Sequence, residues 1–536
     1  MSYQVSRLFI LLLSLMVSIP VFSRERKTLY DFGWRDARTG SERAAVLYKA
    51  QSYAVDNNAY IDYSGIKVID IEITKEFKSI PLGVYNDFCG TVINVTNHWK
   101  DVALFEMKNL STHITVKRHH LDGQIFTDYP ELSRKEILLV IEDENPWVDK
   151  RVGHSQGHIR KDALLIKKGR SRNTVISSYN NGESAPRCVY YKNVSETKYI
   201  RNFTLNRTSE SSRITYCVFV QGQAHLRFEN IVVNTPPSAL YYDMVFRIYD
   251  AADVEFRNVQ INGTYSQADK YGYGFYLNNI WKTTFVNVTG YGVWGVTGNN
   301  NLSDTFLKDC AINRFDIHCY GRNVSLMDCV LGGGDRGWYC GGSSIFGTIR
   351  YERCHFINCT PIAYGHTYKT LVGADVVIKD CVFDVTKQCY SVFTTTLNTD
   401  MNPRESLTQK NLPNIEIDGL QINVPKDIPE IHLYHINKDT YLGTVGYITK
   451  IKLNRIVLND EDKTHPASFV ICNKSLRTDN DIIINIRSFQ NINSTMDLRL
   501  SSTHRNAVSI RQSSFRVSKK MAEGVEVKTK RCIISE

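Results

Sequence analysis

A short phrase typical of β-strands recurs through the middle of this 536-residue chain and limits the fold more than any other feature. Each copy has three or four strand-forming residues, then Asn, Asp or Arg, then Val, Ile or Cys. The Asn, Asp or Arg positions are separated by 28, 29, 22, 19, 25 and 27 residues and are Asn230, Asn258, Asn287, Asp309, Asp328, Arg353 and Asp380. A strand-containing repeat of this length predicts a solenoid of stacked coils, because one coil cannot bury its own apolar side.

The residue order inside the repeats distinguishes among solenoids. The LxxLxLxxN frame of leucine-rich repeats is absent, and a β-propeller would need longer repeats of four strands. The two-residue alternation and the many Val, Ile, Thr, Phe and Tyr residues exclude a helical solenoid. We therefore predict an all-β protein built as a single-stranded parallel β-helix.

Four cysteines, Cys310, Cys329, Cys354 and Cys381, occupy the same place in successive repeats. We expect them to form an interior ladder of free thiols that pack as small apolar groups. Disulfides between them are less favoured, because stacked coils hold a fixed spacing that need not fit disulfide geometry. The 13 cysteines show no CxxC pair and no Cys/His spacing typical of zinc sites.

The first residues are typical of an export signal. Arg7 precedes the apolar run Leu8–Pro20, and Ser23 offers a cleavage point. We predict that residues 1–23 are removed and that the mature chain is secreted or periplasmic. Because no second long apolar run follows, we expect no membrane anchor in the mature chain. We also expect the mature chain to be a monomer.

The region behind the signal has a helix signature. Thr39 and Glu42 have the spacing of a capping box, which predicts a helix that covers the first coil. We predict a cap and first strands over residues 24–120, coils with an active groove over 121–400, and C-terminal coils and edge strands over 401–536.

The charge balance bears on the partner. Lys and Arg number 65 against 55 Asp and Glu, which gives a net charge of +10. A basic excess on an exported protein favours an anionic partner, although many exported proteins are basic without such a ligand. The basic residues are scattered, with no Lys/Arg block and no finger or helix-turn-helix spacing, so nucleic acid is not the expected partner.

The capping helix, the early strands and the coils, over about residues 30 to 400, resemble the pectate-lyase-like superfamily of right-handed parallel β-helices. The resemblance is to the exported bacterial polysaccharide lyases of that group. It implies β-elimination at a uronate of an acidic polysaccharide, with a glycosaminoglycan such as chondroitin, dermatan or hyaluronan as the expected substrate. The WiDH and RxPxxR elements of pectate lyases are absent, as are the NTD, DD, GHG and RxK elements of polygalacturonase-like hydrolases.

Aromatic and glycine-rich segments fall one per coil, just before each recurring phrase, where a polymer would lie along an outer sheet. Aromatic rings stack on sugar faces and glycine permits close approach, although turns and core ladders of any solenoid also use these residues. The segments are Tyr271–Asn279, Gly290–Asn301, Arg314–Asn323, Gly332–Gly342 and Tyr364–Gly373.

One of these segments carries the sharpest chemical signal. In a strand, Arg314, Asp316 and His318 point to one face, while Phe315 and Ile317 point to the other. The first three would place a cation, a carboxylate and an imidazole together outside the core, which suits acid–base chemistry. A surface salt bridge beside an uninvolved histidine is the alternative.

Elimination requires a neutralised carboxylate, a base and an acid, and these roles are assigned by residue type. We assign His318 as base or acid, Arg314 or Asn299 to the carboxylate, and Tyr364 to the remaining proton transfer. The predicted substrate-binding residues are Arg336, Trp338, Trp294, Tyr291, Tyr368 and His366.

Other functions stay open at this point. A glycoside hydrolase would need two carboxylates about 5–10 Å apart, for which Asp304, Asp316 and Asp335 are candidates. A non-catalytic carbohydrate-binding β-helix would need only the aromatic residues. A phage-type receptor spike shares the fold, but the export signal argues against it. No cofactor is assigned with certainty. Outward Asp ladders would suit calcium, but no DxDxDG-type loop supports it.

Overall fold

The computed structural model describes residues 24–96, 102–148, 158–175, 186–207, 215–235, 243–263, 273–291, 295–317, 321–333, 338–342, 345–365, 375–396, 413–435, 450–462, 464–465, 467–472, 483–497, 506–511, 513–517 and 525–535. The predicted export signal lies outside these residues. Within them, no helix is long and apolar enough to cross a membrane.

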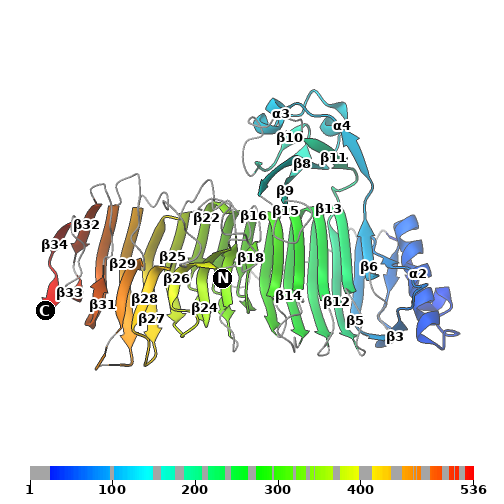
Figure 1. The fold of residues 1–536 in the computed structure, drawn as a ribbon. Helices are drawn as coiled ribbons and strands as arrows, with labels where there is room; N and C mark the ends of the chain where they lie inside the picture. The colour runs from blue at the N-terminus through cyan, green and yellow to red at the C-terminus, as the bar shows by residue number, and fades with distance from the viewer. Residues whose placement is uncertain are drawn as a thin grey trace, which may run out of the picture.

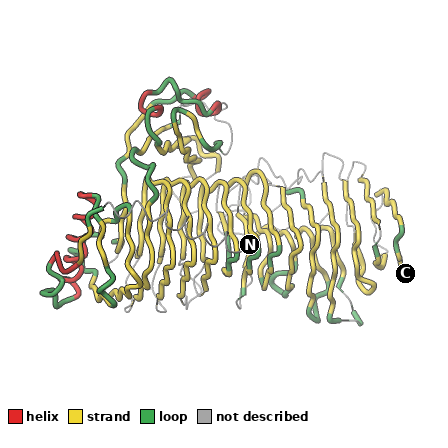
Figure 2. Tube along the Cα trace, turned by 180° about the vertical axis from the view of Figure 1, so that it is seen from behind, coloured by secondary structure: helices red, strands yellow, loops and turns green. Residues whose placement is uncertain are grey.

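The chain forms the predicted right-handed single-stranded parallel β-helix with an N-terminal capping helix (Figures 1 and 2). In the described part of the chain, 28 strands join in one continuous array. Its first strands are β3 (Val68–Glu72), β4 (Ile80–Pro81), β5 (Tyr85–Thr96), β6 (Ala103–Lys108), β12 (Lys198–Arg207), β13 (Thr215–Thr235), β14 (Asp243–Gly263), β15 (Tyr273–Tyr291), β16 (Gly295–Lys308), β17 (Ala311–Ile312), β18 (Asp316–Ile317), β19 (Gly321–Met327), β20 (Val330–Gly332), β21 (Trp338–Gly342), β22 (Ile345–Glu352), β23 (His355–Ile357), β24 (Cys359–Gly365) and β25 (Asp375–Asp384). The array continues through β26 (Ser391–Thr396), β27 (Ile415–Val424), β28 (Glu430–His435), β29 (Lys450–Asp460), β30 (Ser468–Cys472), β31 (Ile483–Asp497), β32 (Asn506–Arg511), β33 (Ser514–Val517), β34 (Val525–Lys530) and β35 (Ile533–Ser535).

Each coil bends at residues in the left-handed backbone region. In β14 these are Asp250, Asp253 and Asn258, with φ of 50°, 53° and 52°. Asn and Asp tolerate this conformation better than other residues with a Cβ. The Asn or Asp of the recurring phrase is the third of these bends in the coils of Asn230, Asn258, Asn287 and Asp309, and the phrase residues of the next three coils, Asp328, Arg353 and Asp380, also have positive φ. The sequence repeat therefore marks a backbone requirement as well as a strand.

The asparagines at these bends also join the coils to one another. The Nδ2 of Asn258 donates to Oδ1 of Asn230 at 2.9 Å, and the Nδ2 of Asn287 donates to Oδ1 of Asn258 at 2.9 Å. A second ladder follows the next edge of the coil, where Asn234 donates to Asn206 at 2.7 Å and Asn262 donates to Asn234 at 2.8 Å. Each amide serves as donor to one coil and acceptor to the next, so polar groups at the bends are satisfied in the stacking direction.

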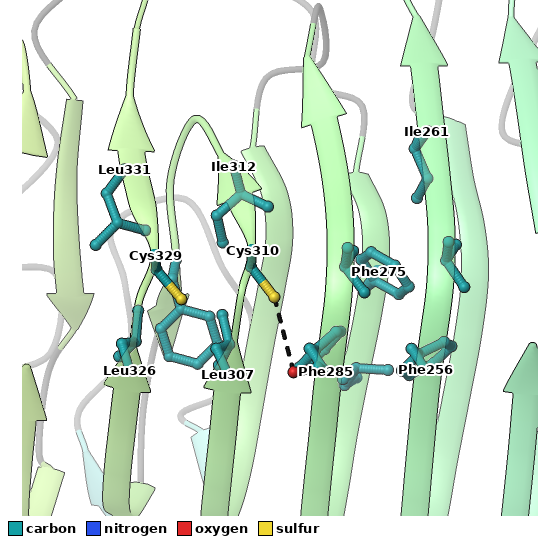
Figure 3. Packing of buried hydrophobic residues seen from close by; sticks show 14 of the residues in the cluster. Phe256, Ile261, Phe275, Phe285, Leu307, Cys310, Ile312, Leu326, Cys329 and Leu331 are labelled. Carbon is teal, nitrogen blue, oxygen red and sulfur yellow. Dashed lines mark hydrogen bonds between the residues drawn. The ribbon is translucent and has the colours of Figure 1, made fainter. Parts of the chain in front are cut away.

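The interior is a set of apolar columns (Figure 3). The rings of Phe228, Phe256 and Phe285 stack at centroid distances of 4.8 and 5.1 Å. The predicted cysteine ladder is confirmed: all four thiols are free and buried, and the backbone N–H of Cys354 lies 3.3 Å from Sγ of Cys381. Contact with Cys310 and Cys354, together with burial, raises the pKa of Cys329, so this thiol remains protonated.

The first coil is covered by α2 (Gly40–Asn57), as predicted. The capping box is formed, because Thr39 Oγ1 accepts from Glu42 N at 3.2 Å and Glu42 Oε2 accepts from Thr39 N at 2.9 Å. Leu47 and Ala50 on its inner face are fully buried. The 3-10 helix η1 (Leu29–Phe32) and the strand pair β1 (Arg26–Thr28) and β2 (Tyr60–Asp62) complete this end.

A separate antiparallel sheet interrupts the coils, which the sequence analysis missed. Its strand order is β10-β9-β8-β11-β7, and two short helices cover it. The bounds are β7 (Ser111–Ile114), α3 (Arg118–Gly123), α4 (Pro130–Ser133), β8 (Ile137–Val148), β9 (His158–Lys167), β10 (Arg170–Ser171) and β11 (Arg187–Tyr191). We call residues 111–191 the insertion, and Figure 1 shows it above β13 to β16.

The insertion corrects the expected division of the chain. Coils were expected from residue 121, but they begin at β3, and the chain from 121 to 191 forms no coil in its described part. The apolar run Ile137–Ile141 resembles a coil strand because both of its faces are buried. Leu139 and Ile141 face the small helices, whereas Leu138 and Val140 pack towards Ala224 and Ala252 of the solenoid. The chain leaves and rejoins the solenoid at one place, since Asn109 Nδ2 donates to Lys192 O at 2.6 Å.

Polar contacts fix the insertion on the solenoid. The Tyr191 hydroxyl donates to Asp250 Oδ2 at 3.1 Å, and its ring lies so close to Gly222 that a Cβ there would meet it at 2.2 Å. Next to this contact, Asp253 accepts from His225, Arg227 and Lys282 at 2.7 to 2.8 Å. His225 also contacts Glu136 of the insertion, with 3.3 Å between Nε2 and Oε2.

We predict that replacing Asn258 destabilises the β-helix according to backbone conformation. Asn258→Ala loses both ladder hydrogen bonds and places a Cβ-bearing residue with low αL propensity at φ 52°. Asn258→Gly loses the same hydrogen bonds but keeps the backbone unstrained, so Ala should cost about 1 kcal/mol more than Gly in the free energy of unfolding. Urea unfolding followed by circular dichroism measures both values, and equal losses would contradict the role assigned to the bend.

We also predict that the contribution of Asp253 depends on pH. Although burial raises its pKa, hydrogen bonds from His225, Lys282 and Arg227 outweigh it and lower the pKa below the ordinary value. A lowered folded-state pKa stabilises above about pH 4 and this stabilisation is lost as pH falls. Asp253→Asn should therefore lower the thermal midpoint at pH 7, and the gap from wild type should shrink at acid pH. Asp309→Asn, at an exposed bend, is the matched control and should leave the midpoint unchanged at both pH values.

Candidate functional site

One outward-facing row runs along the sheet made by the first halves of the long strands and by β18, β21, β24, β26 and β28. The pairing register joins neighbouring members, with Gly298 placed beside Asp316 by the pairing of Asn299 with Ile317. We call it the outer row, and it consists of Phe219, Arg247, Tyr276, Gly298, Asp316, Gly341, Ala363, Thr394 and His435.

Strand alternation explains why this row faces outward. Phe246 and Ile248 flank Arg247 and are fully buried, and Phe275 and Leu277 flank Tyr276 in the same way. Because side chains alternate between the two faces of a strand, Arg247 and Tyr276 lie outside the core.

At its N-terminal end the outer row carries a cation packed among aromatic rings. The guanidinium carbon of Arg247 lies 4.3 Å from the ring centroid of Tyr216, 4.9 Å from that of Tyr249 and 5.8 Å from that of Phe219. Arg247 Nη2 also donates to the Tyr249 hydroxyl at 2.7 Å. The ring of Tyr276 adjoins Tyr249 with 5.9 Å between centroids. We call these five residues the aromatic strip.

The middle of the outer row consists mostly of residues with small side chains. Gly298, Gly341 and Ala363 contribute little or no side chain on three of the four strands between Tyr276 and Thr394. A Cβ on Gly298 would lie 2.4 Å from the ring of Tyr273, so glycine is needed for that ring to lie across the strand. The Tyr273 ring therefore covers Gly298, and Ala363 is 1% exposed, so the small residues in this part of the row let neighbouring groups pack closely over the backbone.

The predicted Arg314–Asp316–His318 trio is only partly formed as expected. Phe315 and Ile317 are buried in the core, as predicted, and Asp316 takes a position in the outer row. The prediction for Arg314 is wrong, because its side chain was expected on the outer surface and the residue is only 4% exposed.

The burial of Arg314 follows a rule shared by several coils. It lies two residues before the outer row, and the side chains at that place in other coils, Cys217, Val245, Val392 and Leu433, are all buried. Strand β18 contains only Asp316–Ile317, so strand alternation does not extend back to Arg314.

The other predicted residues lie on the same sheet or outside the described chain. Asn299 pairs with Leu277 and Ile317, whose side chains are both in the core, so its register is that of inward positions. Tyr364 lies on β24, two strand steps from β18, or about 10 Å away. Trp338 and Tyr291 are strand residues of β21 and β15. His318, Arg336, Trp294, Tyr368 and His366 lie outside the described residues.

The carboxylates considered for hydrolysis are not brought together in the described chain. Asp304 lies at a bend, where it accepts from Trp281 Nε1 and Asn323 Nδ2 at 2.9 Å each. Asp316 lies in the outer row instead, and Asp335 is outside the described residues. No group of three or more His, Cys, Asp or Glu side chains suited to a metal ion occurs among the residues that the structure describes.

The sequence analysis missed the aromatic strip, apart from Tyr276 within the segment Tyr271–Asn279. A usable signal was present, because Phe219 and Arg247 lie 28 residues apart at matching places in two alternating stretches. The glycine-rich segments, on which the sequence prediction relied, lie one to several coils further along the chain.

No protein-family model matches the sequence, and no curated protein sequence matches it. Among solved structures, the chain is similar to the tailspike of Acinetobacter baumannii bacteriophage AP22 in complex with A. baumannii capsular saccharide, with 10% identity, a TM-score of 0.49, and coverage of 94% of this chain and 79% of that one. It is also similar to the tailspike of Pseudomonas phage LKA1, with 12% identity, a TM-score of 0.43, and coverage of 94% and 81%. A third similar structure is the tailspike of Pseudomonas phage phi297, with 10% identity, a TM-score of 0.45, and coverage of 83% and 84%.

Proposed function

We propose that this protein binds an acidic polysaccharide along the outer row and cleaves it at a uronate by β-elimination. The observation that carries the proposal is the aromatic strip, in which Arg247 presents a guanidinium among three aromatic rings on an outer sheet face. Aromatic faces stack on sugar rings, and a guanidinium binds carboxylate or sulfate groups through paired hydrogen bonds.

The shape of the row suits a polymer rather than a small ligand. Its members repeat once per strand, at about 4.8 Å, over nine consecutive strands. The row of paired positions continues from the aromatic strip to β26 and β28. The net charge of +10 favours an anionic polymer.

The finer features of the proposal rest on the sequence. The resemblance to exported bacterial polysaccharide lyases supports elimination as the chemistry. The same resemblance, the basic charge and the export signal favour a glycosaminoglycan such as chondroitin, dermatan or hyaluronan as the substrate. The protein would cleave it outside the cytoplasm.

We predict that Arg247→Ala weakens binding of the cognate acidic polysaccharide by about 10-fold or more, because it removes both the charge and the planar stacking group. Arg247→Lys should recover only part of the affinity, since lysine cannot stack or bind in a bidentate manner. Calorimetry against chondroitin, dermatan, hyaluronan, heparin, pectate and alginate measures this. The matched control is Arg257→Ala on the same strand, whose side chain is 47% exposed and paired with Glu255 on another face.

The reaction is tested with the same polymers by the ultraviolet absorbance of the unsaturated uronate. Absorbance on at least one polymer is the expected result. New reducing ends without that absorbance would show hydrolysis in place of elimination. Binding without either product would leave a carbohydrate-binding protein and overturn the catalytic half of the proposal.

A further inference from the structure

Four ionisable side chains form a connected chain where the outer row reaches β26 and β28. Glu430 Oε2 lies 2.9 Å from His432 Nε2, and His432 Nδ1 lies 2.9 Å from His435 Nδ1. The last link joins His435 Nε2 to the Tyr390 hydroxyl at 3.5 Å. The two imidazole rings are parallel within 2°, and the Tyr390 ring stands edge-on to both. We call these four residues the relay.

The carboxylate at one end fixes where the protons lie. An ionised Glu430 only accepts, so His432 carries its proton on Nε2 and, as a neutral ring, accepts at Nδ1. His435 then donates from Nδ1, which leaves the lone pair on its Nε2. That lone pair faces the Tyr390 hydroxyl, so every link of the relay has the same donor-to-acceptor direction.

His432 is the buried member of the relay. The side chain of His432 is 6% exposed and that of Glu430 is 34% exposed. His435 and Tyr390 are both partly exposed. Burial, and then the negative charge of Glu430, raises the pKa of Tyr390, so its hydroxyl keeps its proton at neutral pH.

The relay is on the same face as the aromatic strip. His435 pairs with Thr394 and is the last described member of the outer row, while its neighbours Leu433 and Tyr434 are fully buried. Seven strand steps separate Arg247 on β14 from His435 on β28, which is roughly 34 Å at about 4.8 Å per step.

We propose that His435 and Tyr390 are the base and the acid that cleave the polymer, and that His432 and Glu430 are positioning residues. This inference rests on the proposed function and names the reacting groups for it. A histidine with a fixed tautomer and a tyrosine beside it supply one acceptor and one donor on the same side of a sugar ring.

The step balances within this pair. His435 Nε2 removes the proton from C5 of the uronate, and the C–H electrons form the C4=C5 double bond. The C4–O bond breaks, its electron pair stays on the glycosidic oxygen, and that oxygen takes the proton of the Tyr390 hydroxyl. The protonated His435 then returns its proton to the Tyr390 phenolate. No oxidant, reductant or further reactant is consumed.

The distances in the relay match this step. The 3.5 Å between His435 Nε2 and the Tyr390 oxygen suits a hydrogen and an oxygen on adjacent carbons of one ring face, which corresponds to syn elimination. His432 and Glu430 stabilise the imidazolium formed in the step, because a positive charge on His435 is shared through His432 with Glu430. The distance to the aromatic strip means that only a polymer occupies both sites.

The experiment measures kcat and KM for appearance of the unsaturated uronate, together with calorimetric binding of the same polymer. His435→Ala and Tyr390→Phe should each lower kcat at least 100-fold while changing affinity less than about twofold. His355→Ala is the matched control, since His355 is 39% exposed and paired with Asp384 on a different sheet. Thermal melts confirm that each variant is folded, and Tyr390→Phe preserves the packed ring.

Two further readouts separate catalysis from a structural role. Glu430→Gln should lower kcat without raising KM, because a neutral amide does not stabilise the positive charge that forms on His435. Arg247→Ala should raise KM for the polymer but leave short oligosaccharides unaffected, because they do not span the two sites.

The outcomes distinguish this inference from the proposed function. Product from the wild-type protein with full activity in His435→Ala or Tyr390→Phe would overturn the assignment of the relay and leave the proposed function standing. Absence of product from the wild-type protein on every polymer would overturn the proposed elimination, and the relay's role in it as well.

Discussion

The left-handed bends filled by asparagine and aspartate are the constraint on which the rest of the structure depends. They set where each coil turns, and their side-chain amides bind the coil before and the coil after. Because the bends keep one register over many coils, a residue type placed at a fixed offset from a bend always meets its counterpart from the next coil. The phenylalanine columns and the cysteine ladder inside, and the outer row outside, all follow from that fixed offset.

The outer row divides its chemical character along its length. The end at β13 to β15 has rings and a cation, which suit recognition of sugars and negative charge. The end at β26 to β28 has ionisable side chains joined by hydrogen bonds. Between the two ends lie Gly298, Asp316, Gly341 and Ala363, three of which have little or no side chain. A solenoid can carry two chemically different groups far apart on one face because its surface extends in one direction.

The fold could be predicted from the sequence because the residues that a β-helix needs at its bends recur at regular intervals along the chain. Asn258 and Asp309 are visible as marks of the period, and the interior cysteines follow one residue after such marks. The candidate site was less accessible. Orientation on a short strand such as β18 depends on where the strand begins, and Arg314 falls before that point and is buried. The relay unites Tyr390 with residues about 40 positions later, and no local pattern reveals such a contact. The insertion was missed because a strand buried on both faces has the same apolar composition in either sheet.

The attachment of the insertion gives the molecule a modular construction. Its two ends lie side by side, because Asn109 donates to the carbonyl of Lys192. The insertion of some eighty residues therefore connects to the solenoid in the same way as a short surface loop. The thermodynamic cost of closing a loop grows only slowly with its length, and the coils on either side stack without reference to what the loop contains. The coil register is therefore independent of the presence and the sequence of this sheet. What holds the insertion in place beside the solenoid is a small set of polar contacts, namely Tyr191 with Asp250 and Glu136 with His225.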